Sequence, residues 1–191
     1  TVAHTDDEDD GSADANGGDE ELDGLYGGTV RFVSKEEAIR GSDIIVNAMN
    51  LTRNPESRFY NVGYFSREYL SQAKRNLIFI NVTRGEIAPE SALLDLYRSG
   101  KITGIGLDVF SSESQFSALL LGQPAETDAN LLAAKALVEK SIDRSSNIYV
   151  QPHQGFNSDI AALTKAVEAV KHIVAWYRNG KERFDEQLPY Y

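Results

Sequence analysis

Apolar, strand-like runs alternate with helical segments through most of this chain, and this alternation strongly constrains the fold. The strand-like runs occupy residues 43–49, 76–82, 102–110 and 147–153. A helical sequence separates the second run from the third, with Pro89 in its first turn and Gly100 at its end. Runs as continuously apolar as NLIFINV are typical of strands that are covered on both faces. The pattern predicts an α/β fold with a doubly wound parallel sheet, Rossmann-like in type.

Several further segments carry their own signals. Ser34 and Glu37 have the spacing of a capping box at the start of a short helix. Apolar residues recur at helical spacing from Ile160 to Tyr177, which predicts a long amphipathic helix. Helices are also expected at residues 65–74 and 125–141, short strands at 1–6 and 29–34, and a helical insertion within 114–146.

The net charge of −10 is concentrated at one end of the chain. Ten acidic residues and no Lys or Arg lie within residues 1–25, which leaves 19 acidic residues to balance the 19 Lys and Arg elsewhere. A neutral body without a basic stripe disfavours nucleic-acid binding. No apolar run approaches the roughly 20 residues that cross a bilayer, so no membrane partner is expected. Cysteine is absent, and no metal site is predicted.

Three polar residues that follow predicted strands suggest the chemistry. In open parallel sheets, ligands bind beyond the carboxyl ends of the strands, and Arg84, Glu113 and His153 all lie just past such ends. Reduction of a 2-keto acid requires a cation to hold the carboxylate and a general acid to protonate the developing alkoxide. A carboxylate behind a histidine fixes its tautomer and favours its protonated form. Each of the three alone could be an ordinary surface or structural residue, but together they match this scheme.

The segment NLIFINVTRGEIAPESALLDLYRSGKITGIGLDVF resembles the signature of the D-isomer-specific 2-hydroxyacid dehydrogenase family. The matching positions are Asn81, Arg84, Gly85, residues 99–101 and residues 104–110. In that family the catalytic Glu follows the last motif at the position of Glu113, and the catalytic His follows a Pro, as in Pro152-His153. Residues 153–156 and 161–163 look most like the D-lactate dehydrogenase branch.

The resemblance implies an oxidoreductase that transfers a hydride between NAD(H) and a 2-keto acid/D-2-hydroxy acid pair. His153 would be the general acid and base, Glu113 its support, and Arg84 the substrate clamp. A non-catalytic, corepressor-like NAD-binding protein on the same fold is the alternative. Asp108 could align the nicotinamide or close a turn, and Asp6 could bind the adenosine ribose or merely begin an acidic run. Cofactor contacts are expected at Asp6, Met49, Asn50, Val82, Thr83, Arg84, Asp108, His153 and Gly155.

The sequence also departs from the family pattern. No GxGxxG phosphate loop occurs, and Ala48-Met49-Asn50 replaces the usual His-x-Pro. The first departure suggests that the N-terminal strand–helix unit and the substrate domain are missing, and that the chain is inactive alone. We therefore expect an incomplete NAD-binding domain at residues 1–152 with a mobile acidic segment at 7–28. Residues 153–191 would form the catalytic His loop and a C-terminal helix leading toward the substrate domain. A cytoplasmic homodimer, paired through the nucleotide-binding domain, is expected for the parent protein.

Overall fold

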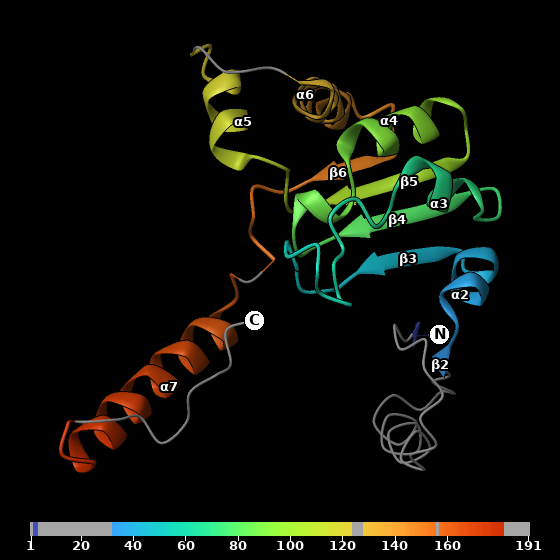
Figure 1. Cartoon of the computed structure of the whole chain (residues 1–191). Helices are drawn as coiled ribbons and strands as arrows, with labels where there is room; N and C mark the ends of the chain where they lie inside the picture. Colours follow the sequence, from blue (N-terminus) through green and yellow to red (C-terminus); the bar gives the residue numbers. More distant parts are fainter. Residues whose placement is uncertain (1, 4–31, 124–127, 156, 182–191) are drawn as a thin grey trace.

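The computed structural model describes residues 2–3, 32–123, 128–155 and 157–181, and it confirms the predicted alternation of strands and helices (Figure 1). The strands are β1 (Val2–Ala3), β2 (Phe32–Val33), β3 (Ile44–Asn47), β4 (Leu77–Asn81), β5 (Ile102–Leu107) and β6 (Ile148–Val150). The helices are α2 (Lys35–Gly41), α3 (Arg67–Ser71), the short 3-10 helix η1 (Gly85–Ile87), α4 (Glu90–Arg98), α5 (Glu113–Leu120), α6 (Ala129–Ile142) and α7 (Asp159–Arg178). Asp6 and the acidic segment at 7–28 lie outside the described residues.

The central sheet consists of four parallel strands in the order β3-β4-β5-β6. Asn47 on β3 is in register with Asn81 on β4, which is in register with Leu107 on β5. The segments that follow these strands therefore leave the sheet at one edge. The short strands β1 and β2 pair in parallel as a separate two-stranded sheet. These features confirm the predicted Rossmann-like α/β class.

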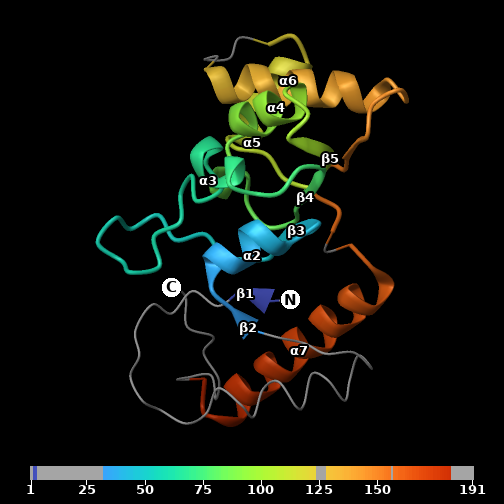
Figure 2. The same ribbon diagram turned by 90° about the vertical axis from the view of Figure 1, so that its right-hand side faces the viewer.

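Helices α3, α4 and α6 cover one face of the central sheet (Figures 1 and 2). The core lies between these layers, where Leu77, Phe79 and Ile102 of the strands and Leu93 and Leu137 of the helices are fully buried. The other face is less covered than the apolar sequence predicts. Among the described residues, the side chains of this face are largely exposed at Ile44, Val46 and Tyr149 and half-buried at Ile78 and Ile80.

Local sequence signals explain where several helices begin and end. The Ser34 side chain accepts a hydrogen bond from the Glu37 amide at 3.2 Å, as the capping box predicts. Asp128 caps α6 in the same way, through the Leu131 amide at 2.8 Å. Pro89 occupies the N-cap of α4, one residue earlier than predicted. After α4, Gly100 has a φ of +74°, a conformation that favours glycine.

Two predicted helical regions are confirmed. The expected insertion contains α5 and α6, and the Ser91 hydroxyl on α4 donates to Asn130 Oδ1 of α6 at 2.6 Å. The amphipathic helix α7 extends away from the central sheet, and no residue between Asp159 and Arg178 is buried (Figure 1). Within the described part of the chain, no helix is both long and apolar enough to span a membrane.

Candidate active site

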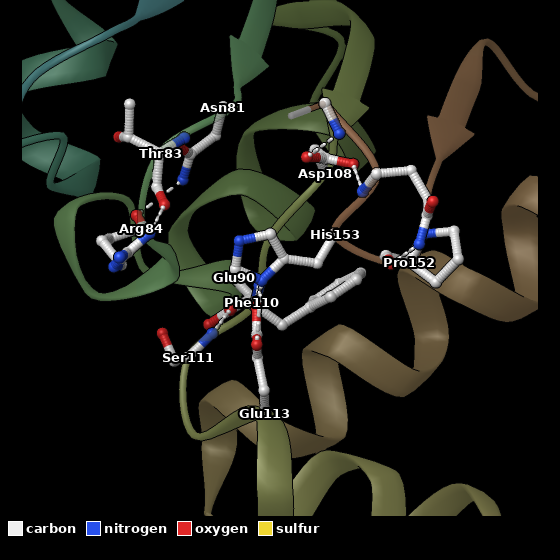
Figure 3. A network of polar contacts seen from close by, with 12 residues as sticks. Asn81, Thr83, Arg84, Glu90, Asp108, Phe110, Ser111, Glu113, Pro152 and His153 are labelled. Atoms are coloured by element: carbon white, nitrogen blue, oxygen red, sulfur yellow. Dashed lines mark hydrogen bonds and ion pairs between the residues drawn. The ribbon is translucent and has the colours of Figure 1, made fainter. Parts of the chain in front are cut away.

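The predicted catalytic residues meet at the carboxyl edge of the central sheet (Figure 3). Arg84 lies just after β4, Glu113 begins α5 after β5, and His153 follows β6. Figure 3 shows the His153 ring between Arg84 and the main chain of its own loop, with Glu113 below the ring. The parallel register of the strands explains why residues so distant in sequence converge here.

His153 and Glu113 form a close pair. Nδ1 of His153 lies 3.0 Å from Oε1 and 3.1 Å from Oε2 of Glu113, and both side chains are partly exposed. A hydrogen on Nδ1 would be donated to this carboxylate, which would fix the tautomer of the ring. This is the geometry of a histidine whose tautomer and orientation are set by a carboxylate.

Asp108 holds the loop that carries His153. Its buried carboxylate accepts hydrogen bonds from the amides of Gln154 at 2.6 Å and Gly155 at 2.7 Å. The His153 amide donates to the Asp108 carbonyl oxygen at 2.8 Å. These bonds hold the backbone of His153 at a φ of +53°, a conformation that residues other than glycine rarely adopt.

The Asp108 contacts differ from the turn-closing role considered for it in the sequence. The carboxylate binds backbone amides, but these belong to the loop after β6 rather than to its own turn. A Cβ on Gly155 would lie 2.7 Å from Asp108 Oδ2, so the close approach favours glycine at this position. The predicted contact of Asp108 with the nicotinamide stays a prediction.

A buried amide network joins the ends of β3 and β4. The Asn47 side-chain NH₂ donates to Asn81 Oδ1 at 2.9 Å and to Thr83 Oγ1 at 3.0 Å. The Asn81 NH₂ donates to the Arg84 carbonyl oxygen at 3.0 Å, and Arg84 Nη1 donates to the Thr83 carbonyl oxygen at 2.8 Å. The network fixes the backbone that presents Arg84. The sequence analysis did not identify Asn47, although a polar residue ending an otherwise apolar strand is a usable signal.

The loop after β3 is fixed without the proline usual in the family. The Met49 amide donates to Asn47 Oδ1 at 3.1 Å, and Asn61 Nδ2 donates to the Asn50 carbonyl oxygen at 2.7 Å. Asn61 also accepts from the Thr52 amide at 2.8 Å. These side-chain bonds to backbone replace the rigidity that a proline would give.

The surface beside these loops suits part of a dinucleotide. Asn50 and Val82 are exposed, and Met49 and Thr83 are partly exposed, so apolar and polar groups are both open at the sheet edge. A flat, polar cofactor requires this mixture. The described residues supply no glycine-rich loop for the phosphates. They could therefore contact only the part of such a cofactor that lies beyond the ends of the strands.

Glu90 is a further residue of this region that the sequence analysis missed. It is the first residue of α4, its side chain is 1% exposed, and its Oε1 accepts from the Ser111 amide at 2.6 Å. Burial raises the pKa of Glu90 to about 7, and the charge of Asp128 acts in the same direction. A Glu next to a helix-starting proline is usually solvated, so the sequence carries no signal of its burial.

Comparisons with known proteins give consistent results. A family model described as D-isomer specific 2-hydroxyacid dehydrogenase, NAD binding domain, matches residues 19–155. The chain is 29% identical to the glyoxylate reductase/hydroxypyruvate reductase of Homo sapiens, over 77% of this chain and 37% of that protein. It is 36% identical to the probable 2-ketogluconate reductase of Dictyostelium discoideum, over 63% of this chain and 30% of that protein. The chain thus spans about a third of the length of these curated relatives.

Solved structures show the same fold. The D-lactate dehydrogenase from Aquifex aeolicus, complexed with NAD and lactic acid, superposes with a TM-score of 0.63 at 25% identity, covering 83% of this chain and 45% of that one. A D-lactate dehydrogenase from Sporolactobacillus has a TM-score of 0.65 at 23% identity, covering 84% of this chain and 43% of that one. The two sequence relatives named above are reductases of other acids, so the resemblance to the D-lactate branch stays a prediction.

Proposed function

This chain belongs to the D-isomer specific 2-hydroxyacid dehydrogenases, within their NAD-binding domain, and we propose that it carries the catalytic residues of an NAD-dependent oxidoreductase. The substrates would be 2-keto acids and D-2-hydroxy acids. The observation that carries the proposal is the contact of 3.0 Å between His153 Nδ1 and Glu113 at the edge where Arg84 also lies.

His153 would move the proton of the reaction. With Glu113 at Nδ1, the Nε2 atom would donate its proton to the carbonyl oxygen at C2 of the keto acid. In the reverse direction Nε2 takes the hydroxyl proton. Glu113 holds the ring in one tautomer and stabilises its positive charge. The cofactor, when bound as NADH, would supply the hydride to C2.

Arg84 would bind the substrate carboxylate. A guanidinium offers paired donors in a plane that matches a carboxylate, and it keeps its charge at any physiological pH. The Asn47–Asn81–Thr83 network holds the backbone that presents it. One donor of Arg84 already contacts the Thr83 carbonyl oxygen, which limits the directions of the fork.

The remaining assignments concern the cofactor and the parent protein. Met49, Asn50, Val82, Thr83, Asp108 and Gly155 would line the cofactor side. Residues 1–152 would serve as the cofactor domain, with Asp6 at the adenosine ribose, and residues 153–191 would lead toward a substrate domain. The parent protein would be a cytoplasmic homodimer, and the 191-residue chain would not turn over substrate by itself.

Turnover by the full-length protein that carries this chain tests the proposal. NADH absorbance is followed with pyruvate, hydroxypyruvate, glyoxylate and 2-ketoisocaproate. His153→Gln should lower kcat by about 10²–10⁴-fold while the variant still binds NADH, because the ring transfers a proton. His172→Gln on α7 is the matched control and should keep full activity. NADH binding without oxidation by any of these acids would favour the corepressor-like alternative, and full activity of His153→Gln would contradict the role of His153.

A further inference from the structure

The buried carboxyl group of Glu90 binds the loop that leads to Glu113. Glu90 is 1% exposed, and its Oε1 accepts from the Ser111 amide at 2.6 Å, which is short for such a bond. Oε2 has no hydrogen-bond partner among the described residues. Burying a carboxyl group with one unpartnered oxygen costs free energy of folding. Such a group therefore needs a structural or functional explanation.

The Ser111 amide lies at the point where the chain turns from β5 into α5. Ser112, the next residue, has a φ of +50°, and Glu113 follows as the first residue of the helix. The Phe110 amide faces Glu113 Oε1 at a long 3.5 Å, so this contact alone fixes the carboxylate weakly. On the other side, the Gly85 backbone packs so closely against Phe110 and Ser111 that no Cβ would fit.

Glu90 is therefore linked to His153 through a short chain of contacts. The chain runs from Glu90 to the Ser111 amide, two residues along to Glu113, and from Glu113 to His153 Nδ1 (Figure 3). We propose that Glu90 is a positioning residue, whose buried carboxyl group holds the Ser111 amide and thereby sets Glu113 behind the His153 ring. The inference rests on the function proposed above for Glu113 and His153.

The surroundings of Glu90 support this role. Helix α4 directs its N-terminal amides toward the Glu90 end, where a carboxylate is favoured. Asp128 at the N-cap of α6 is the charged group from the neighbouring helix that acts on Glu90, and it opposes ionisation. The Ser111 amide opposes Asp128, because its hydrogen bond favours the ionised form. Burial, the largest effect, acts with Asp128 to raise the pKa of Glu90, and the hydrogen bonds from Ser111 act against both.

Three variants distinguish a positioning role of Glu90 from a purely structural contribution to the fold. Glu90→Leu fills the space without an acceptor, and Glu90→Gln keeps an oxygen for the Ser111 amide. Ser91→Ala is the matched control, because it removes the hydroxyl bond from residue 91 to Asn130, keeps the backbone amide bond to the same oxygen, and leaves Ser111 held. Glu90→Met replaces the leucine variant if that one does not fold.

Two measurements without NAD or substrate give the answer. Hydrogen exchange of the Ser111 amide should be faster in Glu90→Leu by at least about tenfold. The ring-nitrogen signals of His153, identified by their loss in His153→Gln, should shift toward those of Glu113→Gln as the ring loses its single tautomer. Glu90→Gln and Ser91→Ala should retain the parent values for both.

Unchanged ring signals in Glu90→Leu would overturn the inference, and so would an equal shift in Ser91→Ala. Neither measurement requires turnover. A negative result for Glu90 would therefore not affect the kinetic test of His153. Conversely, an enzyme assay that contradicts the proposed function leaves the link between Glu90 and the ring measurable.

Discussion

Glu90 makes the stability of the domain depend on pH. Its pKa is raised from 4.5 to about 7, chiefly by burial, so the folded state binds a proton that the unfolded state releases. The contribution of Glu90 to the free energy of unfolding should therefore be greatest below pH 4.5 and fall between pH 4.5 and 7. The predicted loss from this group is about 3 kcal/mol. Urea unfolding of the chain at intervals from pH 4.5 to 8 measures it.

Glu90→Gln supplies the comparison for this prediction. The amide cannot ionise, so the difference in unfolding free energy between variant and parent should grow in favour of the variant as the pH rises to 7. Above pH 7 the difference should stay constant. Parallel pH profiles for the two proteins would show that Glu90 does not titrate in this range.

The sequence predicts some residues of this site well and others not at all. Arg84, Glu113 and His153 are predictable because each is a chemically suitable type placed just after an apolar strand. Asn47 carries a weaker signal, as a polar residue at the end of an apolar strand, and Glu90 carries none, because its importance depends on the neighbours that the fold brings to it. Asn47 reaches Asn81 and Thr83 across the sheet, and Glu90 reaches Ser111 across the gap between α4 and β5. Neither set of contacts can be predicted from the neighbouring sequence.

At the scale of elements, local signals account for most of what was predicted. The cap at Ser34 and the helix stop near Gly100 lie where the sequence places them. The predicted strands run a few residues too long: residues 43–49 became Ile44–Asn47, and 102–110 became Ile102–Leu107. Ladder hydrogen bonds end before the apolar sequence does, because the chain turns away at the carboxyl edge to form the site.

Asp128 has two opposing effects on α6 and its neighbours, and they can be separated. It caps α6 through the Leu131 amide, but its charge disfavours ionised Glu90. Asp128→Ala should lower the free energy of unfolding by about 1 kcal/mol, since it removes the cap. Asp128→Asn keeps a capping oxygen and removes the charge, so it should be as stable as the parent at pH 5 and more stable at pH 8. Denaturant unfolding at both pH values measures this.

Comparison of the two Asp128 variants distinguishes the effect of the charge on Glu90 from the effect of the helix cap. If Asp128→Asn gains no stability at pH 8 relative to pH 5, the charge of Asp128 does not act on Glu90. If Asp128→Ala is as stable as the parent at pH 5, the α6 cap contributes nothing to the fold. Ser34→Ala, at the cap of α2, provides a control far from Glu90.

For the whole molecule, the uncovered face of the central sheet is the largest difference from the sequence prediction. NLIFINV is as apolar as a strand covered on both sides, yet helices of the described chain cover one side of it. On the other side, Ile44 is 54% and Val46 53% exposed, and Tyr149 is 66% exposed. Soluble monomers rarely leave such a contiguous apolar surface in water.

This surface should be measurable in the isolated 191-residue chain. We expect it to bind a hydrophobic dye such as ANS and to self-associate with increasing concentration in sedimentation experiments, because burial of apolar area is favourable. Val46→Thr combined with Ile44→Thr should lower both signals, whereas Leu132→Thr, an exposed apolar position on the helical side, should change them little. If a longer parent protein carries this chain, as proposed above, and its additional residues cover the face, that protein should bind less dye per chain. Equal dye binding by both proteins would show that this face of the sheet stays open in the complete protein.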